Sequence, residues 1–548
     1  MLVHERAVLD AGGSFILPEK TIWVAPQEFV LSAPVPLGIV SSGTGAFLFA
    51  SPLSGKEGTA DMLKPDLNTV QKLAEDYSIV PVCREIYGDS ITPIAILRKL
   101  AAKSQRYFLL ESVEGGEKWG RYSFLGCDPV LRVTCAKGIV RIEETEGCRE
   151  ILSQKPLEVL REILKSYRSP ILPDFPPFTG GFAGYFAYSM IGYAEPVLKI
   201  TNETFADYDV MLFDKILAYD HLKQKLSVIV NIRTDRAEEN YKRAEEQIQE
   251  LIALLRQAEP APERREKEEI HFTCSVSKEE YCRMVEKTKS YIRNGDIFQA
   301  VISRKFESPM KNSLFNAYRV LRTTNPSPYM VYFHTEQEEL MSTSPETLVR
   351  LQNGKLTTFP VAGSRPRGRN PEEDERLKRE LLSDEKELSE HNMLVDLGRN
   401  DLGKISRYGS VKVAEYMQVH KYSKIMHICS QVESRIQKDR DGLDAIEAVL
   451  PAGTLSGAPK IRACQIIEEI EKEERGIYGG ALGYLDFAGN LDTCIAIRMA
   501  VRKNGKVSVQ AGGGIVADSV REMEYEESAN KAAAVMQAVI RAEEVEEE

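Results

Sequence analysis

The sequence of 548 residues lacks the marks of several common classes of protein. Its nine cysteines are scattered and form no CxxC pair, as is typical of reduced thiols in a cytosol. No apolar run is long enough to span a bilayer, and the N-terminus lacks the basic start and apolar core of a signal peptide. A net charge of −11 argues against a general nucleic-acid or membrane partner. We therefore expect a cytoplasmic protein that binds neither nucleic acid nor membrane.

Several motifs of catalysis and nucleotide binding are also missing. The sequence has no HExxH and no cluster of Cys and His, which excludes the usual zinc sites. GTGAFL (43–48) and AGGGIVAD (511–518) do not match GxGxxG, and SPLSGKE lacks the first glycine and the Ser/Thr of a phosphate-binding loop. No cysteine occurs in a GxCxG context. The sequence therefore gives no sign of a nucleotide site or a cysteine nucleophile.

What the chain does contain is typical of a globular protein with more than one domain, 43% hydrophobic and 28% charged. Residues 1–65 are Ser/Gly-rich and aperiodic, and we interpret them as a flexible or mis-assigned leader. The charged stretch at 258–270 predicts a linker between an N-terminal domain, 66–257, and a catalytic domain, 271–548. Strand-like and helical segments alternate in both parts, which predicts a mixed α+β fold.

Two local patterns in the second part predict a helix followed by a strand. SKEE (277–280) is a capping box at the start of a helical pattern, and Asn294-Gly295 is a stop signal at its end. FQAVISRKF (298–306) then predicts a strand with Gln299, Val301 and Ser303 on one face.

PVAGSRPRG (360–368) continues into Arg369, so three arginines fall within five residues of an acidic protein. A guanidinium stays charged and matches carboxylate or phosphate geometry. An ordinary solvated turn explains an isolated RxRxR equally well. Taken with the overall charge, the loop favours a small anionic ligand.

The stretch LPAGTLSGAPKIRACQIIEEI (450–470) ends a glycine loop at the start of a helix, with Pro459 at a favoured first position. Free N–H groups at a helix start attract anions. An ordinary capped helix accounts for the same pattern.

ELSEHNMLVDLGRNDLG (387–403) places Glu390 on the helical face of Leu394 and Leu397, so its carboxylate points toward the core. A buried carboxylate needs a cation, a strong donor or a raised pKa. A metal ligand and a Glu that favours a helix start both fit. Glu524, Glu526 and Glu527 are alternative second carboxylates, and periodicity does not choose among them. From the residues alone we infer an enzyme for a small dianion, with Mg²⁺ held by carboxylates.

Twelve stretches in order resemble the anthranilate synthase large subunits of the chorismate-utilising enzyme family, over roughly residues 66–548. They are LLES (109–112), GRYSFLG (120–126), NPSPYM (325–330), STSPE (342–346), VAGSRPRG (361–368), ELSEHNMLVDLGRNDLG (387–403), KYSKIMH (421–427), LPAGTLSGAPK (450–460), IYGGALGY (477–484), LDTCIAIR (491–498), VQAGGGIVADS (509–519) and YEESANK (525–531). The resemblance implies two packed β-sheets flanked by helices.

The resemblance also assigns the site. It implies that the arginine loop forms part of the wall of the chorismate pocket. The implied Mg²⁺ ligands are Glu390 and Glu527, an oxygen-only pair that leaves room for a substrate carboxylate. The implied chorismate contacts are Gly363, Ser364, Tyr478, Arg498, Gly512, Gly513 and Gly514.

The implied chemistry has two steps. Ammonia attacks C2 of chorismate while Glu346, as general acid, protonates the leaving 4-hydroxyl. His427 then removes the C2 proton as pyruvate leaves; without the resemblance, a buried structural histidine would be the simpler interpretation. Thr454 and Gln299 complete the implied catalytic set. Relatives that add water carry a Lys where this chain has Gln299, and many aminodeoxychorismate synthases carry a Lys at Ala362, so both positions favour anthranilate as the product.

Two other functions remain open: an aminodeoxychorismate synthase component, and a tryptophan-binding relative without activity. We expect the chain to use free ammonium by itself, and glutamine only through a separate amidotransferase subunit, in a heterotetramer of two large and two small subunits. The resemblance further implies feedback inhibition by L-tryptophan at a site that contains Ser112, Pro328, Tyr329 and Met330. A strand end and a turn explain the same two motifs, LLES and NPSPYM, without a ligand.

Overall fold

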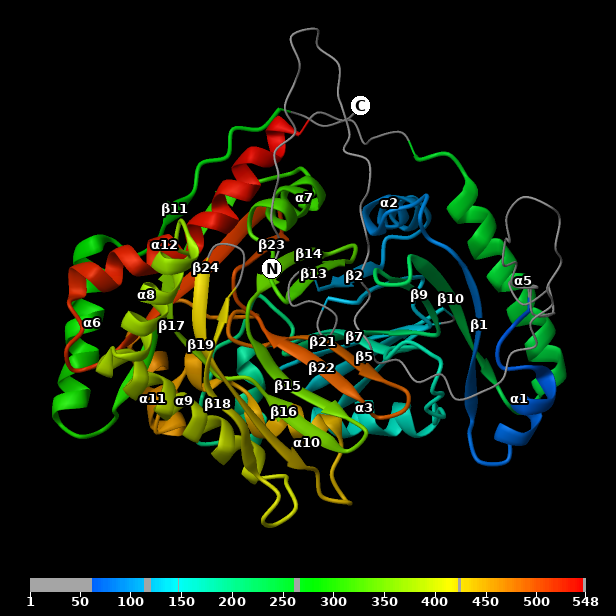
Figure 1. Ribbon diagram of the computed structural model, residues 1–548, viewed down its shortest axis with the longest axis horizontal. Helices are drawn as coiled ribbons and strands as arrows, with labels where there is room; N and C mark the ends of the chain where they lie inside the picture. Colours follow the sequence, from blue (N-terminus) through cyan, green and yellow to red (C-terminus); the bar gives the residue numbers. More distant parts are fainter. Residues whose placement is uncertain (1–61, 113–119, 146, 261–266, 422–424, 546–548) are drawn as a thin grey trace, which may run out of the picture. The chain divides into compact units, whose positions relative to one another are not determined.

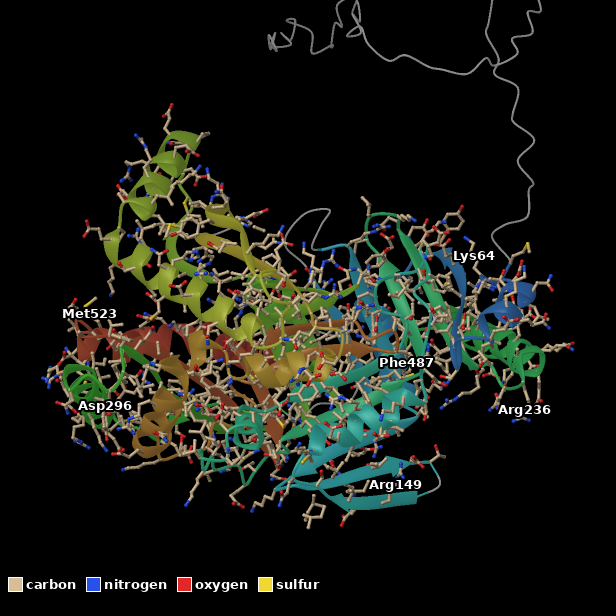
Figure 2. All side chains as sticks on the ribbon, turned by 90° about the horizontal axis from the view of Figure 1, so that it is seen from below. Lys64, Arg149, Arg236, Asp296, Phe487 and Met523 are labelled. Atoms are coloured by element: carbon tan, nitrogen blue, oxygen red, sulfur yellow. The ribbon has the colours of Figure 1, made fainter. Side chains whose placement is uncertain are left out.

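The computed structural model describes residues 62–112, 120–145, 147–260, 267–421 and 425–545, which belong to one compact unit. Most of the predicted leader, residues 1–61, lies outside the described residues. Within its last four residues, Leu63 is buried, and Lys64, which is labelled in Figure 2, forms an antiparallel β-bridge with Cys83. The packed structure therefore begins before residue 66.

Two antiparallel sheets form the middle of this unit (Figure 1). The first has the strand order β1 (Ile79–Tyr87), β10 (Lys225–Arg233), β9 (Lys215–Asp220), β3 (Tyr122–Cys127), β2 (Tyr107–Glu111), β13 (Tyr329–His334), β14 (Glu338–Ser344), β23 (Met499–Lys503), β24 (Lys506–Ile515), β12 (Gln299–Pro309) and β11 (Thr273–Cys274), with β20 (Gly457–Ala458) also paired to β12. The second has the order β17 (Val361–Pro366), β19 (Ile425–Arg435), β16 (Lys355–Thr358), β15 (Thr347–Gln352), β22 (Leu491–Ile495), β21 (Ala481–Asp486), β7 (Gly181–Phe186), β8 (Tyr208–Phe213), β4 (Leu131–Ala136), β5 (Ile139–Glu144) and β6 (Gly147–Leu152), with β18 (Lys412–Lys421) paired to β19.

Helices cover the outer faces of both sheets. In Figure 1, α12, α7 and α2 lie above the sheets and α10 and α3 lie below them. The helices are α1 (Leu67–Leu73), α2 (Pro93–Lys103), α3 (Pro156–Lys165), α4 (Ile191–Ala194), α5 (Ala237–Arg256), α6 (Lys278–Arg293), α7 (Phe315–Thr324), α8 (Pro371–Leu382), α9 (Glu385–Gly403), α10 (Gly442–Val449), α11 (Lys460–Ile470) and α12 (Arg521–Arg541), with single turns η2 (Tyr188–Met190), η3 (Gly453–Leu455) and η4 (Ala542–Glu544).

Three buried clusters hold the layers together. The cluster between the sheets takes Phe108 and Phe124 from the first sheet and Phe213 and Leu482 from the second. A larger cluster joins the first sheet to α2, α5, α7 and α12, and another joins the second sheet to α3, α9 and α10. The result is a four-layer arrangement of helices, sheet, sheet and helices, which confirms the predicted α+β class.

Strands from both predicted domains share both sheets. In the first sheet β2 pairs with β13, and in the second β7 pairs with β21. The division at 258–270, part of which lies outside the described residues, stays a prediction about the chain. It does not separate two cores, because each sheet runs continuously across it.

In the second part the predicted helix, its stop signal and the strand are confirmed, and of the predicted capping box the bond made by Ser277 is present. The side chain of Ser277 caps α6 by accepting from the backbone N–H of Glu280, and Gly295 follows the helix with a φ of 82°. The strand predicted at 298–306 is β12. Pro459 precedes the first turn of α11, one residue earlier than predicted.

Candidate active site

The glycine run of β24 lies against β12 and α12, and its lack of side chains permits the close approach. A β-carbon on Gly512 would lie 2.3 Å from the carbonyl oxygen of Ile302. One on Gly513 would lie 2.9 Å from Glu524 Oε2, and one on Gly514 would lie 2.2 Å from Gln299 Nε2. The predicted residues Gln299 and 512–514 therefore come together, and any larger residue would displace them.

Tyr478 and Arg498 lie beside this strand. The backbone of Gly512 hydrogen-bonds the Tyr478 hydroxyl, and burial raises the pKa of that hydroxyl, so it stays protonated. Arg498 has a φ of 46°, a conformation that few non-glycine residues adopt. Burial lowers the pKa of Arg498, and the charge of Glu346 opposes that shift. Arg498 is therefore a poorly solvated cation in the site, suited to a carboxylate ligand.

Glu346 precedes β15 and receives a hydrogen bond from η3. Thr454 Oγ1 lies 3.2 Å from Oε1 and 3.3 Å from Oε2 of Glu346. Burial raises the pKa of Glu346 to about 8, although the Thr454 hydroxyl and the charges of Arg498 and Lys531 act in the opposite direction. Glu346 is thus a neutral carboxylic acid at pH 7, the form that a general acid needs.

His427 is held by a bulge in the strand beside it. The register between β17 and β19 shifts at Gly363, which has a φ of 66°, and Ser364 pairs with His427. His427 Nδ1 lies 3.0 Å from the carbonyl oxygen of Gly363. A carbonyl can only accept, so Nδ1 carries a proton, and Nε2 is the nitrogen left to act as a base.

The two predicted metal ligands come from α9 and α12. Glu390 is half-buried, and burial together with the charges of Glu387 and Glu527 raises its pKa. Lys531 opposes that shift; its Nζ lies 2.8 Å from Glu527 and 3.2 Å from the carbonyl oxygen of Gly512. The α12 segment that carries these groups begins near Met523, labelled in Figure 2.

Sequence reasoning missed Lys531 and Glu387, and it left Glu524 as one alternative among three. Each stands three or four residues from a predicted ligand: Glu387 three before Glu390, Lys531 four after Glu527, and Glu524 three before it. That spacing puts each on the same helical face as its predicted neighbour, and it was the signal that could have identified them.

The role predicted for the arginine loop is wrong for two of its members. Arg365 Nη2 lies 2.8 Å from Asp384, and Arg367 binds Asp374 through both its Nε and Nη2. These guanidinium groups connect β17 to α8 and α9, and their charge is already paired. Gly363 and Ser364 of the same loop lie beside His427, and Arg498 and Lys531 are cations near Glu346.

A cavity of about 310 Å³ lies between the two sheets, and neither Glu346 nor His427 lines it. Ser112, Pro328 and Tyr329 line it, and the buried Ser112 hydroxyl has no hydrogen-bond partner among the residues that the structure describes. Met330 does not line it: the side chain is fully buried in the helix-covered core, because alternate residues of β13 face opposite sides. Arg350, Asp492 and Tyr484 also line the cavity, and no sequence pattern predicted this.

Comparison with known proteins decides the family. The model of the chorismate binding enzyme family matches residues 107–537. The chain belongs to the chorismate-binding enzyme family. Within that family it is similar to anthranilate synthase component 1 of Acetivibrio thermocellus, at 45% identity over 494 residues, which cover 88% of this chain and all of the relative. Anthranilate synthase component 1 of Aquifex aeolicus (strain VF5) is 44% identical over 497 residues, which cover 89% of this chain and all of the relative.

Solved structures of chorismate-binding enzymes share the fold. Anthranilate synthase component I from Streptococcus pneumoniae TIGR4 matches with a TM-score of 0.69 at 36% identity, over 82% of this chain and 98% of that chain. The menaquinone-specific isochorismate synthase from Escherichia coli matches with a TM-score of 0.61 at 19% identity, over 86% of this chain and 98% of that chain, which shows the fold alone. The predicted family and fold are confirmed.

Proposed function

We propose that this chain is the chorismate-utilising subunit of an anthranilate synthase, a lyase that converts chorismate and ammonia into anthranilate and pyruvate. The observations that carry the proposal are a buried acid, Glu346, whose pKa is raised to about 8, and a histidine, His427, whose Nδ1 is bonded to the Gly363 carbonyl. One group gives a proton to a leaving hydroxyl, and the other takes a proton from carbon.

In this proposal, two cationic side chains and the main chain of β24 bind the substrate. Chorismate carries two carboxylates, and Arg498 and Lys531 supply the charges for them. Gly512, Gly513 and Gly514 let the ligand approach the main chain closely, and Tyr478 donates from a hydroxyl that stays protonated. Gly363 and Ser364 close the site on the β17 side.

We propose Mg²⁺ as the cofactor, held by Glu390 and Glu527. Their residue types fit, because the charge of Glu527 raises the pKa of Glu390, a cation would relieve that repulsion, and Mg²⁺ prefers oxygen ligands. Among the residues that the structure describes, no group of three or more acidic, His or Cys side chains could hold a metal ion. Two carboxylates with open positions suit an ion that also binds the substrate. Bound there, Mg²⁺ would supply Lewis-acid polarisation of the substrate's ring carboxylate.

The chemistry of the residues follows in two steps. Ammonia bonds to C2 as Glu346 protonates the 4-hydroxyl, which leaves as water, and Thr454 stabilises the Glu346 carboxylate that remains. His427 Nε2 then takes the C2 proton, and the C3–oxygen bond breaks to leave an aromatic ring and the enolate of pyruvate. The methylene carbon of the enolate takes up a proton to give pyruvate. The Gly363 carbonyl stabilises the imidazolium that forms, through the Nδ1 proton.

The choice of nucleophile favours ammonia. Gln299 cannot act as a base toward water, and Ala362, buried in β17, offers no amine nucleophile. The runner-up, an aminodeoxychorismate synthase component, would retain the side chain of chorismate and release no pyruvate. His427 favours anthranilate, because only the elimination of pyruvate needs a base at C2.

We further propose a partner and an inhibitor. The relatives are named as component 1, which favours a separate amidotransferase component that supplies ammonia from glutamine, in a heterotetramer of two subunits of each kind. L-tryptophan fits the 310 Å³ cavity, where Tyr329 offers an aromatic wall and the Ser112 hydroxyl has no partner among the described residues. All nine cysteines are free thiols, and no described helix is long and apolar enough to cross a bilayer. A cytoplasmic location fits the thiols.

A turnover assay separates the three functions. With chorismate, Mg²⁺ and ammonium, the purified chain should release anthranilate and pyruvate in equal amounts. His427→Ala should still consume chorismate but release no pyruvate, so that an aminated intermediate accumulates. An amino product without pyruvate from the unmodified chain would favour the aminodeoxychorismate reaction, and no turnover would favour the binding protein.

A further inference from the structure

A small cavity of about 50 Å³ is lined by Glu346 and by Thr454, which donates a hydrogen bond to Glu346. None of the predicted chorismate contacts lines it. Its walls come from β15, from η3 and from α9, which presents Gly398 and Asp401 to it. A water molecule needs roughly 10–15 Å³ of such space and two or more polar partners. The cavity therefore has room for about three water molecules.

The polar groups of this cavity are spread along its walls. Glu346 and Thr454 stand on one side and Asp401 stands on α9, with Thr358 on the wall that joins them. Thr358 Oγ1 donates to the carbonyl oxygen of Leu348, 3.0 Å away, so its lone pairs remain as acceptors. The remaining lining is largely apolar, which confines water to a path between the carboxyl groups.

Asp401 connects this path to the surface. Its side chain is 8% exposed, and one carboxylate oxygen lies 3.2 Å from Nζ of Lys404, a residue whose side chain is 47% exposed. The other oxygen lies 2.7 Å from Nζ of Lys460, which is buried and also donates to the carbonyl oxygen of Val449. Asp401 is thus a fixed carboxylate between the cavity and a lysine in solvent.

The proposed reaction requires Glu346 to regain a proton after each turnover. Each turnover moves one proton from Glu346 to the departing 4-hydroxyl, while the new amine at C2 and the C2–H bond each release one. One of these protons goes to the methyl carbon of pyruvate, and Glu346 must regain the other. The small cavity offers Glu346 a route for that proton along walls that hold none of the predicted chorismate contacts.

We infer that the cavity is a proton relay, in which water links Asp401 to Glu346 and resets the general acid between turnovers. Asp401 is a positioning and relay residue here, and it does not touch the substrate. This inference rests on the proposed role of Glu346 as general acid.

Two variants test the relay. Asp401→Asn combined with Lys460→Met replaces the buried ion pair by a neutral pair of similar volume, which avoids an unpaired charge. Gly398→Ala narrows the cavity, since its β-carbon would lie 3.2 Å from Thr358 Cγ2 and 3.6 Å from Pro360 Cγ. Gly403→Ala is the matched control in the same helix, because a β-carbon there meets nothing within 4 Å.

The readout is the split between two kinetic constants with saturating ammonium and Mg²⁺. Slow return of the proton follows product formation, so kcat should fall by about tenfold, less than the ~10²–10⁴-fold that general acid catalysis itself contributes. The value of kcat/KM for chorismate should stay within about twofold, and the solvent deuterium isotope effect on kcat should rise. Gly403→Ala should match the unmodified chain.

Three outcomes would overturn the relay. The first is an unchanged kcat in both the double variant and Gly398→Ala. The second is an equal fall in kcat and kcat/KM, which indicates displaced catalytic groups. The third is a fall in kcat in Gly403→Ala equal to that in Gly398→Ala. Glu346→Gln separates this failure from failure of the proposed function. If Glu346→Gln abolishes turnover while the relay variants behave normally, only the relay is lost; if Glu346→Gln remains active, the acid assignment itself is wrong.

Discussion

The hydroxyl of Thr454 donates to the carboxyl group of Glu346, lying 3.2 and 3.3 Å from its two oxygens. The bond stabilises the carboxylate, yet burial has the larger effect, and the pKa of Glu346 rises to about 8. We therefore expect Glu346 to be protonated before each turnover. After it has given up its proton, its carboxylate accepts the hydrogen bond from Thr454. This pair links β15 in the second sheet to the 450–460 loop.

Activity should decline as pH rises through about 8, because Glu346 must start protonated. Thr454→Val removes a donor that lowers the pKa, so the alkaline limb should move up by roughly 0.7–1 pH unit, the equivalent of a hydrogen bond of ~1–1.5 kcal/mol. The check is a pH–rate profile at constant free ammonia and saturating Mg²⁺. A limb that stays in place or moves to lower pH would contradict this role of Thr454.

Loss of either proposed metal ligand should abolish Mg²⁺-dependent turnover. Glu390→Gln and Glu527→Gln keep side-chain volume and remove charge, so we expect activity to fall by at least ~100-fold and Mg²⁺ affinity to weaken. Glu390→Gln should not lower the melting temperature of the metal-free protein, since it relieves repulsion from Glu387 and Glu527.

Glu526→Gln is the matched control for the metal prediction. Glu526 adjoins Glu527 but is exposed and pairs with Lys278, 3.4 Å away. Mg²⁺ titrations of activity and calorimetric binding would compare the three variants. Near-normal turnover of Glu390→Gln at saturating chorismate would disprove the assignment.

Ser112→Arg should remove tryptophan inhibition without slowing the uninhibited enzyme. The larger side chain fills the 310 Å³ cavity and brings a charge to a buried position. Inhibition curves at several chorismate concentrations provide the measurement, and tryptophan and chorismate should weaken each other's binding to the same extent in the unmodified chain. Full inhibition of the Ser112 variant would show that tryptophan binds elsewhere.

Tyr329→Phe should separate tryptophan binding from its effect on catalysis. The Tyr329 hydroxyl lies 3.0 Å from Thr347 Oγ1, and Thr347 follows the acid Glu346, so this contact joins the cavity to the catalytic strand β15. We expect tryptophan to bind with little change while the coupling to chorismate weakens by about 1 kcal/mol, within the usual 1–3 kcal/mol range. Calorimetric titration with and without chorismate measures both. Coupling that survives intact would exclude this contact as a route.

Deletion of residues 1–61 should leave kinetics and melting temperature unchanged, as the sequence pattern predicts. Deletion to residue 65 should destabilise, because it also removes Leu63, which is buried in the helix-covered core beside the first sheet. Full burial of a leucine contributes about 1.5–3 kcal/mol. Thermal unfolding of the two truncations distinguishes the cases. A large loss in the shorter deletion would show that residues 1–61 contribute to stability.

The sequence by itself determined the family, the fold class and the local signals. Ser277 and Gly295 delimit α6 through backbone geometry that acts within one turn, so a linear pattern is enough to predict them. The position of Glu390 on the core side of α9 follows from helical periodicity. The order of twelve motifs carried the rest, including the predicted acid Glu346 and the predicted base His427.

Only the tertiary structure decided which charges meet. Arg365 and Arg367 are paired with α8 and α9, while Lys531, which no motif distinguished by itself, lies among the carboxylates of the site. The same holds for Met330, which faces the core because β13 alternates, and for the cavity between Glu346 and Asp401. Partner choice, burial and cavity volume depend on distances between elements far apart in sequence, and those distances are set by sheet pairing and helix packing rather than by local propensity.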